Sequence, residues 1–254
     1  MGTTAGGEVV VLDSAGYGAF VISQPVSITA PPGVYAGITA FSGNGIEIDA
    51  GASDTVVLRG LTVNNQGSSG SGIVSNSGGT LHIEGCVVNG FSTGGFGVVF
   101  QAAGKLEMKD SIIRGNQNGI IVSPAPGTAQ ATFDQVRIEE NLNDGLQAGS
   151  GSTVMVRNSV ASGNGNLAFR ASSDNSTAAE LNIESCAASN NGTGIQAESS
   201  STGVATIRVS NSTVTDNTTG LSQSGTAVLL SRVNNTVEGN TTNTSGTIGS
   251  YSAK

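Results

Sequence analysis

The sequence predicts an all-β chain in which three short strands per turn coil into a parallel solenoid. Three observations support this: a repeat of about 25 residues, apolar residues that alternate within each repeat, and an outward column whose charges change sign from turn to turn. Alternation of apolar and polar residues is typical of half-buried strands and not of helices. Because one such unit cannot bury its own inner face, the units must stack on one another.

The repeat is clearest at one position, which is asparagine in every later turn. It falls at Gln66, Phe91, Asn116, Asn141, Asn164, Asn191, Asn217 and Asn240, with spacings of 25, 25, 25, 23, 27, 26 and 23 residues. These spacings predict eight or nine turns in a single domain, 1–254, with irregular first turns over 1–54, regular turns over 55–240 and a polar tail over 241–254.

Each turn is expected to bury one apolar column per strand. The first strand buries Leu58, Ile83, Met108, Phe133, Val156, Ile183 and Val209. The second strand buries Val63, Val88, Ile113, Ile138, Ala161, Ala188, Val214 and Val237. The third strand buries Ile46, Ile73, Val98, Ile120, Leu146, Phe169, Ile195 and Leu221. Like strands of successive turns should then pair in parallel, roughly 4.8 Å apart.

Asparagine and glycine are expected at the corners between these strands. Asparagine tolerates a left-handed backbone, and stacked asparagines can bond to one another along the solenoid. One corner series is Asp110, Gln135, Asn158, Ser185, Asn211 and Asn234, and the second is the repeat position from Asn116 onward. The neighbouring glycines are expected to supply further positive-φ positions, and they are Gly119, Gly145, Gly194 and Gly220.

Two patterns check this register. The outward column of the first strand reads Arg59, Glu84, Lys109, Asp134, Arg157, Glu184 and Ser210, which places opposite charges on adjacent strands. We interpret it as a surface ladder and not as a set of catalytic groups. Cys86 and Cys186 fall at one position four turns apart, or roughly 19 Å at ~4.8 Å per turn, so they predict two buried free thiols.

Two segments, AELNIESCAASNNGTGIQAES and ATIRVSNSTVTDNTTGLSQS, resemble repeats of right-handed parallel β-helix proteins of the pectin-lyase-like class. The shared pattern is strand, Asn or Ser corner, strand, Asn-Gly loop and Gly-Ile strand. The resemblance implies a right-handed β-helix from an exported or cell-surface bacterial protein. It implies no single function, because unrelated activities occur on this scaffold. The segment MGTTAGGEVV lacks the features of a signal peptide, so none is expected in this chain.

The composition argues against a nucleic-acid partner and against a membrane-spanning segment. Ten Lys and Arg against 18 Asp and Glu give a net charge of −8, whereas a nucleic-acid-binding protein needs a basic surface to neutralise phosphates. No apolar run is long enough to span a membrane. The expected partners are therefore a polysaccharide or another protein.

Few residues suggest catalysis. In lyases and hydrolases of this class the resemblance implies an active groove, which we expect on the third strand. Arg170 and Glu198 lie together there, and Glu47 and Asp49 form a second pair about five turns away. A calcium-dependent lyase needs several carboxylates and a basic side chain, and a glycosidase needs two carboxyls. Neither pair is flanked by a second carboxylate column, so the sequence leaves catalysis uncertain and leans against it.

Metal sites are equally weak. Glu139, Glu140 and Asp144 cluster in one loop and could hold a weakly bound calcium, although a solvated acidic loop is the better interpretation. His82 points outward from the first strand without a second ligand beside it, which does not suggest a zinc site. The sequence therefore predicts no cofactor.

Two groups of side chains could form a ligand surface. Phe91 and Phe96, in a longer loop, are expected to be exposed and are the best candidates for stacking on a sugar, followed by Tyr17 and Tyr35. A second group, the apolar stripe, is expected to point outward from successive third strands and comprises Val74, Val99 and Ile121. The stripe is either a partner surface or covered by loops, and it or the solenoid ends could join copies of the chain.

Three functions therefore remain open. The leading one is a non-catalytic scaffold or adhesive surface module. The others are a glycan-binding module and a polysaccharide lyase or hydrolase of the pectin-lyase-like class.

Overall fold

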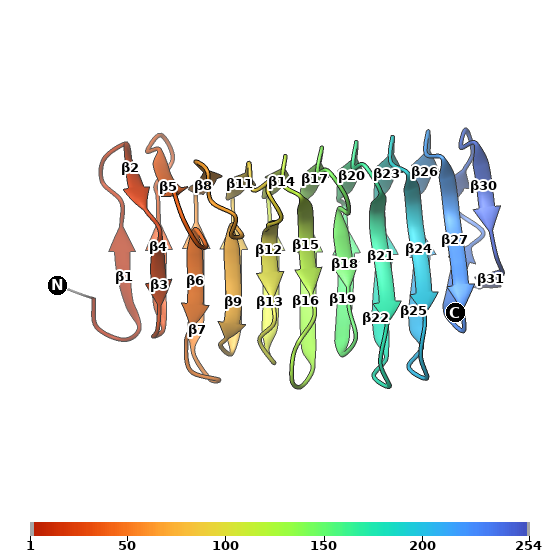
Figure 1. Cartoon of the computed structure of the whole chain (residues 1–254), viewed down its shortest axis with the longest axis horizontal. Helices are drawn as coiled ribbons and strands as arrows, with labels where there is room; N and C mark the ends of the chain where they lie inside the picture. The colour runs from red at the N-terminus through yellow and green to blue at the C-terminus, as the bar shows by residue number, and fades with distance from the viewer. Residues whose placement is uncertain (1–2, 253–254) are drawn as a thin grey trace.

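The computed structural model describes residues 3–252, which coil into a solenoid of 31 strands. The strands stack along the long axis of the molecule, with the N-terminus at one end and the C-terminus at the other (Figure 1). They form three sheets of 11, 10 and 10 strands, and neighbouring strands are parallel. The predicted parallel solenoid with three strands per turn is confirmed.

Each turn contributes one strand to each sheet. Sheet A contains β1 (Gly7–Val10), β4 (Val26–Thr29), β7 (Thr55–Arg59), β10 (Thr80–Glu84), β13 (Lys105–Lys109), β16 (Ala129–Asp134), β19 (Ser152–Arg157), β22 (Ala179–Glu184), β25 (Ala205–Ser210), β28 (Val228–Arg232) and β31 (Ile248–Tyr251). Sheet B contains β2 (Ala15–Gly18), β5 (Ala36–Ala40), β8 (Leu61–Asn65), β11 (Val87–Asn89), β14 (Ile112–Arg114), β17 (Arg137–Glu139), β20 (Val160–Ser162), β23 (Ala187–Ser189), β26 (Thr213–Thr215) and β29 (Thr236–Val237). Sheet C contains β3 (Phe20–Ile22), β6 (Ile46–Asp49), β9 (Ile73–Ser77), β12 (Phe96–Phe100), β15 (Asn118–Val122), β18 (Leu146–Ala148), β21 (Leu167–Ser173), β24 (Thr193–Ser199), β27 (Thr219–Gly225) and β30 (Thr242–Ser245).

The core fills the space inside the three sheets. The predicted inward columns of the first and third strands are buried throughout, and the second-strand column is buried except for Val237, which is partly buried. Phe133 on β16 and Phe169 on β21 are among the largest fully buried side chains. The segment 241–254, predicted as a polar tail, is polar and contains the short strands β30 and β31.

The asparagine ladder runs along the corner between sheets B and C. Side-chain amides of successive turns bond to each other at 3.1, 2.9, 3.0, 3.0 and 2.9 Å from Asn116 through Asn141, Asn164, Asn191 and Asn217 to Asn240. Each Oδ1 also accepts the backbone N–H of the preceding turn, as Asn164 does from Asn141. The predicted ladder is confirmed, and it satisfies backbone groups that the corner would otherwise bury unpaired.

The first corner series adopts the expected backbone. Asp110, Gln135, Asn158, Ser185 and Asn211 have φ between 50 and 55°. Asn234, the last member predicted, is not among the positive-φ residues.

At the second corner, the prediction that the glycines supply positive φ is wrong. Positive φ occurs at the residue before each ladder asparagine, for example at Glu140 and Asn190, and not at Gly119 or its equivalents. The glycines instead allow close approach between turns. A Cβ on Gly119 would lie 2.3 Å from the carbonyl oxygen of Gly145.

The two cysteines are free and buried, as predicted. Their backbone N–H groups donate to serine hydroxyls one turn ahead, each at 3.1 Å, from Cys86 to Ser111 and from Cys186 to Ser212. Burial raises the pKa of both thiols to about 11, so they are protonated at neutral pH. They belong to the core and corner packing.

Candidate functional site

The charged face of sheet A is the first candidate surface. Strands β7, β10, β13, β16 and β19 alternate between buried and outward side chains, so every second residue reaches solvent. The face surrounds a depression of about 460 Å³ and presents the side chains of Arg59, His82, Glu84, Glu107, Lys109, Asp134 and Arg157. The strand register pairs the predicted outward column residue by residue, which confirms its order.

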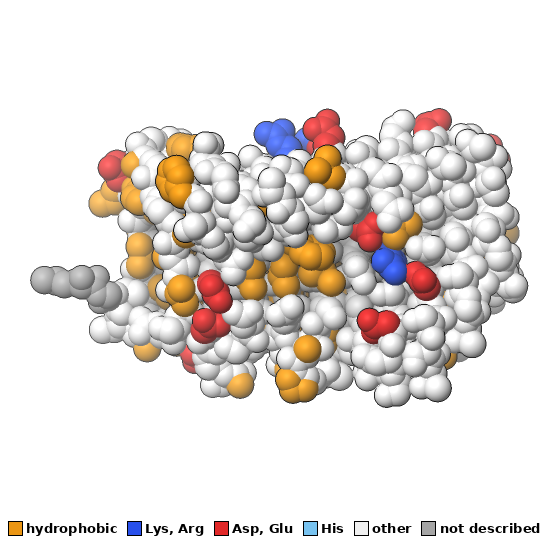
Figure 2. Space-filling view, in the orientation of Figure 1, with side chains coloured by type: hydrophobic (Ala, Val, Ile, Leu, Met, Phe, Trp, Pro, Cys, Tyr) orange, Lys and Arg blue, Asp and Glu red, His pale blue; other side chains and the backbone are white. Residues whose placement is uncertain are grey.

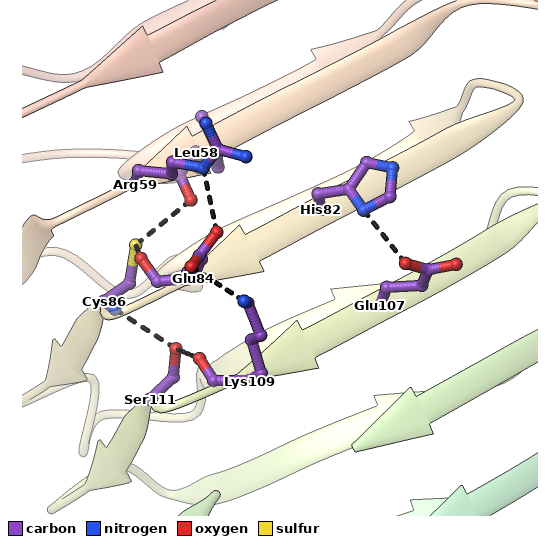
Figure 3. Close-up of polar contacts among 8 residues, drawn as sticks. All are labelled: Leu58, Arg59, His82, Glu84, Cys86, Glu107, Lys109 and Ser111. Carbon is purple, nitrogen blue, oxygen red and sulfur yellow. Dashed lines mark hydrogen bonds and ion pairs between the residues drawn. The ribbon is translucent and has the colours of Figure 1, made fainter. Parts of the chain in front are cut away.

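Glu84 lies at the centre of this face and uses one oxygen for each neighbouring turn. Its Oε2 lies 2.9 Å from Nε of Arg59, and its Oε1 lies 2.9 Å from Nζ of Lys109 (Figure 3). The hydrogen-bonded ammonium of Lys109 is the main cause that lowers the pKa of Glu84, and Arg59 adds to it. The carboxylate therefore stays ionised at neutral pH and is a poor proton donor.

The rest of the face is paired in the same way. Arg157 lies 3.0 Å from Asp134, and Nδ1 of His82 lies 3.1 Å from Glu107. His82 thus points outward, as predicted, and its neighbour is a carboxylate (Figure 3). These pairs are largely exposed, so each stabilises the fold only slightly.

We expect Glu84→Gln to reduce the free energy of unfolding by less than about 1 kcal/mol at neutral pH and low salt. Because the folded-state pKa of Glu84 is lowered, the stabilisation is present above its unfolded pKa and is lost as the pH falls through the folded value. Denaturant titrations at pH 7 and about pH 3 test this. The matched control is Glu238→Gln, since Glu238 is exposed and makes no ion pair within residues 3–252. A pH-independent difference for Glu84→Gln, or the same difference in both variants, contradicts the expectation.

Sheet C carries the second candidate surface, around Arg170 on β21. Nη2 of Arg170 lies 2.7 Å from Oε2 of Glu198 on β24, so these two side chains are together as predicted. Nη1 lies 3.6 Å from Oδ2 of Asp144, which comes from the preceding turn. Burial raises the pKa of Asp144, and the positive charge of Arg170 opposes that rise. The three side chains define the Arg170 cluster.

The sequence did not predict that Asp144 belongs to this cluster. Asp144 lies in the loop before β18, and strand register pairs Gln147, not Asp144, with Arg170. The long arginine side chain reaches it diagonally. An acidic residue three positions before an outward residue of the neighbouring strand is the signal that could have indicated this contact.

The three acidic residues considered as candidate calcium ligands do not gather into one site. Glu139 pairs with Arg137 at 2.9 Å, Glu140 is exposed at a corner with φ 54°, and Asp144 faces Arg170. Across residues 3–252, no three His, Cys, Asp or Glu side chains are grouped so that they could hold a metal ion.

Glu47 and Asp49, the other candidate pair on sheet C, lie on β6 near the N-terminal end of the sheet. Nδ2 of Asn76 donates to Glu47 at 2.9 Å and to Asp49 at 3.0 Å. Asn76 therefore bridges these two carboxylates.

The prediction that Phe91 is exposed is wrong. Phe91 is 0 % exposed, and its backbone N–H donates to Oδ1 of Asn116 at 3.1 Å, so it fills the ladder column one turn before the first asparagine. Phe96, at the start of β12, is half-buried. Of the two tyrosine candidates, Tyr17 is half-buried and Tyr35 is exposed, at 52 %.

The apolar stripe is less accessible than its outward direction suggested. Val74 and Val99 are only 8 % and 7 % exposed, and Ile121 is half-buried. Side chains in one column stand about 4.8 Å apart, so each shields the next. Apolar side chains gather in the middle of this face (Figure 2). Little of the stripe is therefore open to a partner.

A family model described as the right-handed β-helix region matches residues 44–242. No curated protein matches the chain. Within the described residues there is no helix with the length and apolar character needed to cross a membrane. The matched segment spans most of the chain and covers strands β6 to β29 of the solenoid, so the protein belongs to the right-handed β-helix family.

Proposed function

We propose that the chain is a non-catalytic β-helix scaffold, a surface module that presents fixed side chains to a polysaccharide or protein partner. The observation that supports this best is the pairing of outward charges between turns. Carboxylates on sheets A and C are held by cationic side chains of adjacent turns, and the pairs are Glu84 with Arg59 and Lys109, Asp134 with Arg157, Glu180 with Arg208, and Glu198 with Arg170.

This pairing suits a binding surface better than a reaction centre. A general acid needs a proton to give near the working pH, and its pKa must be raised to hold one. An ion-paired carboxylate stays ionised and keeps its position. Such a surface offers ordered donors and acceptors at a spacing set by the turns, about 4.8 Å.

The Arg170 cluster favours the second candidate, a polysaccharide lyase or hydrolase. Burial raises the pKa of the Asp144 carboxyl, so this group holds a proton more readily than an exposed aspartate does. Nε of Arg170 is also buried and has no hydrogen-bond partner among the described residues. If the chain acts on a polysaccharide, this cluster is where the chemistry would take place.

The test incubates the purified chain with neutral and acidic polysaccharides, with calcium and with a chelator. New reducing ends report hydrolysis, and ultraviolet absorbance reports the unsaturated products of a lyase. We expect no products. Products that disappear in Arg170→Ala but persist in Arg137→Ala, a surface arginine on β17 paired with Glu139, contradict the proposal and support the enzyme.

A glycan array on the same variants separates the two kinds of scaffold. Binding that is lost in Arg170→Ala and retained in Arg137→Ala supports a glycan-binding module on sheet C. If no glycan on the array binds, a protein is the better candidate for the partner.

A further inference from the structure

The C-terminal half of sheet C presents a broad polar surface. Strands β21, β24 and β27 have seven residues each, more than any other strand in the described part of the chain. Together with β18 they carry two outward columns, which we call the polar columns. The first column is Gln147, Arg170, Gln196 and Ser222, and the second is Ser172, Glu198 and Ser224. Figure 2 shows this part of the face as mostly white, the colour of uncharged polar side chains and backbone.

The first polar column has a regular spacing. Strand pairing places Gln147 beside Arg170, Arg170 beside Gln196, and Gln196 beside Ser222. Its four members are separated by three steps of one turn, or roughly 14 Å at ~4.8 Å per turn. An extended chain of β-1,4-linked sugars advances by nearly the same distance per sugar residue. Such a chain, laid along the solenoid axis, would bring each successive sugar to the same position on the next turn.

The polar columns contain hydrogen-bonding groups that the protein itself leaves free. Nε2 of Gln147 donates to Oγ of Ser172 at 2.9 Å, which fixes this amide across the turns. Among residues 3–252, the side chains of Gln196 and Ser222 form no hydrogen bond with another part of the chain. A glutamine amide and a serine hydroxyl can each donate and accept, and so can the hydroxyl groups of a sugar.

Charge distinguishes the sugars that fit. Arg170 lies between two carboxylates, 2.7 Å from Glu198 and 3.6 Å from Asp144, so the Arg170 cluster has two negative groups and one positive group. An acidic sugar would have to displace Glu198 from Arg170 and would be repelled by both carboxylates. A neutral sugar can instead donate its hydroxyl groups to the carboxylates without breaking the ion pair.

The same surface is a poor match for a protein partner. The buried centre of a protein–protein interface is rich in apolar and aromatic side chains and poor in charged ones. The polar columns contain no apolar member, in contrast to Val74, Val99 and Ile121 at the corresponding position of earlier turns. Hydrogen bonding to a hydroxyl-rich ligand is therefore the recognition that this half of sheet C supports.

We propose that the polar columns bind a neutral, extended polysaccharide that lies along the solenoid axis, with about one sugar residue per turn from β18 to β27. The inference rests on the proposed scaffold function and names the partner of this surface. Gln147, Gln196 and Ser222 hydrogen-bond to successive sugars, and the Arg170 cluster excludes acidic ones.

The probes are cello-, xylo- and manno-oligosaccharides of two to six residues, with oligogalacturonides of the same lengths as the acidic comparison. Calorimetric titration measures the affinity of each. We expect at least one neutral series to bind, with an affinity that rises up to about four residues and then stays level, since the first column spans three turns. The acidic series should bind about tenfold more weakly or worse.

Two variants test the assigned residues. Gln196→Ala should weaken the neutral oligosaccharide about tenfold, because it removes a free amide from the middle of the column. Glu198→Gln should keep the neutral ligand and strengthen the acidic one about tenfold, because it removes a negative charge and releases Arg170. The matched control is Gln130→Ala, an exposed glutamine on β16 of sheet A, which should bind as the wild type does.

Four results overturn the inference: no binding by any neutral series, acidic binding as strong as neutral binding, equal affinities of Gln196→Ala and Gln130→Ala, and an affinity that keeps rising through six residues. Each of them leaves the scaffold function in place, with a partner of another kind or at another surface. Cleavage of the same oligosaccharides during the titration would instead contradict the scaffold function itself.

Discussion

Replacing Asn164 by alanine should lower the free energy of unfolding by about 3–5 kcal/mol, because it interrupts the ladder at its middle and leaves several buried groups unpaired at roughly 1–3 kcal/mol each. Oδ1 of Asn164 accepts the backbone N–H and the side-chain amide of Asn141, at 3.2 and 2.9 Å. Its Nδ2 donates to the carbonyl of Ile138 at 3.1 Å and to Asn191 at 3.0 Å. Asn164 is 1 % exposed, so water cannot readily replace these partners. Denaturant unfolding measures the loss.

The control for this variant is Asn76→Ala. Asn76 is exposed, and among residues 3–252 its side-chain amide bonds only to the surface carboxylates Glu47 and Asp49. We expect it to change the free energy of unfolding by about 0.5 kcal/mol or less. Similar losses in the two variants would show that the ladder bonds stabilise the corner no more than surface contacts do.

The second large effect is expected at Gly119. A Cβ there would lie 2.3 Å from the carbonyl oxygen of Gly145 and 2.9 Å from Cγ2 of Ile138. Since backbone of the next turn cannot move without shifting the stack, Gly119→Ala should destabilise the protein by about 1–3 kcal/mol or more. Thermal and denaturant unfolding provide the measurement.

Gly18→Ala is the matched glycine variant. A Cβ on Gly18 meets no atom within 4 Å, and its φ is not positive. Alanine there should be neutral or slightly stabilising, because it restricts the unfolded chain. A neutral Gly119→Ala would mean that the turns separate more easily than the close approach implies.

The repeat in the sequence specifies most of this fold. Apolar columns assign the inward faces, and the alternating charges from Arg59 to Glu184 fix the register independently. The ladder follows from the asparagines in one column. The sequence does not show why glycine is needed at Gly119 and its equivalents. Glycine is required both where φ is positive and where two backbones approach closely, and only the corner geometry distinguishes these two reasons.

For Phe91, the repeat position and the local composition predict opposite degrees of burial. Phe91 occupies the ladder column with Asn116, and that column points inward. Its place in a glycine-rich loop suggested exposure instead. The column was the better predictor, since strand pairing carries the direction of a side chain from one turn to the next.

The candidate surfaces depend on features that the repeat does not encode. The Arg170 cluster depends on the reach of one long side chain to Asp144 in the preceding turn.

Hydrogen exchange at the ladder asparagines tests the rigid scaffold most directly. The backbone amides of Asn116, Asn141, Asn164, Asn191 and Asn217 lie at corners, where exchange is ordinarily fast, but each donates to the side chain of the next turn at 2.9 to 3.2 Å. We expect them to exchange as slowly as the amides of the neighbouring strands. Exchange as fast as that of exposed loops would show that the corners open independently. A solenoid with open corners could not hold its outward side chains in fixed positions.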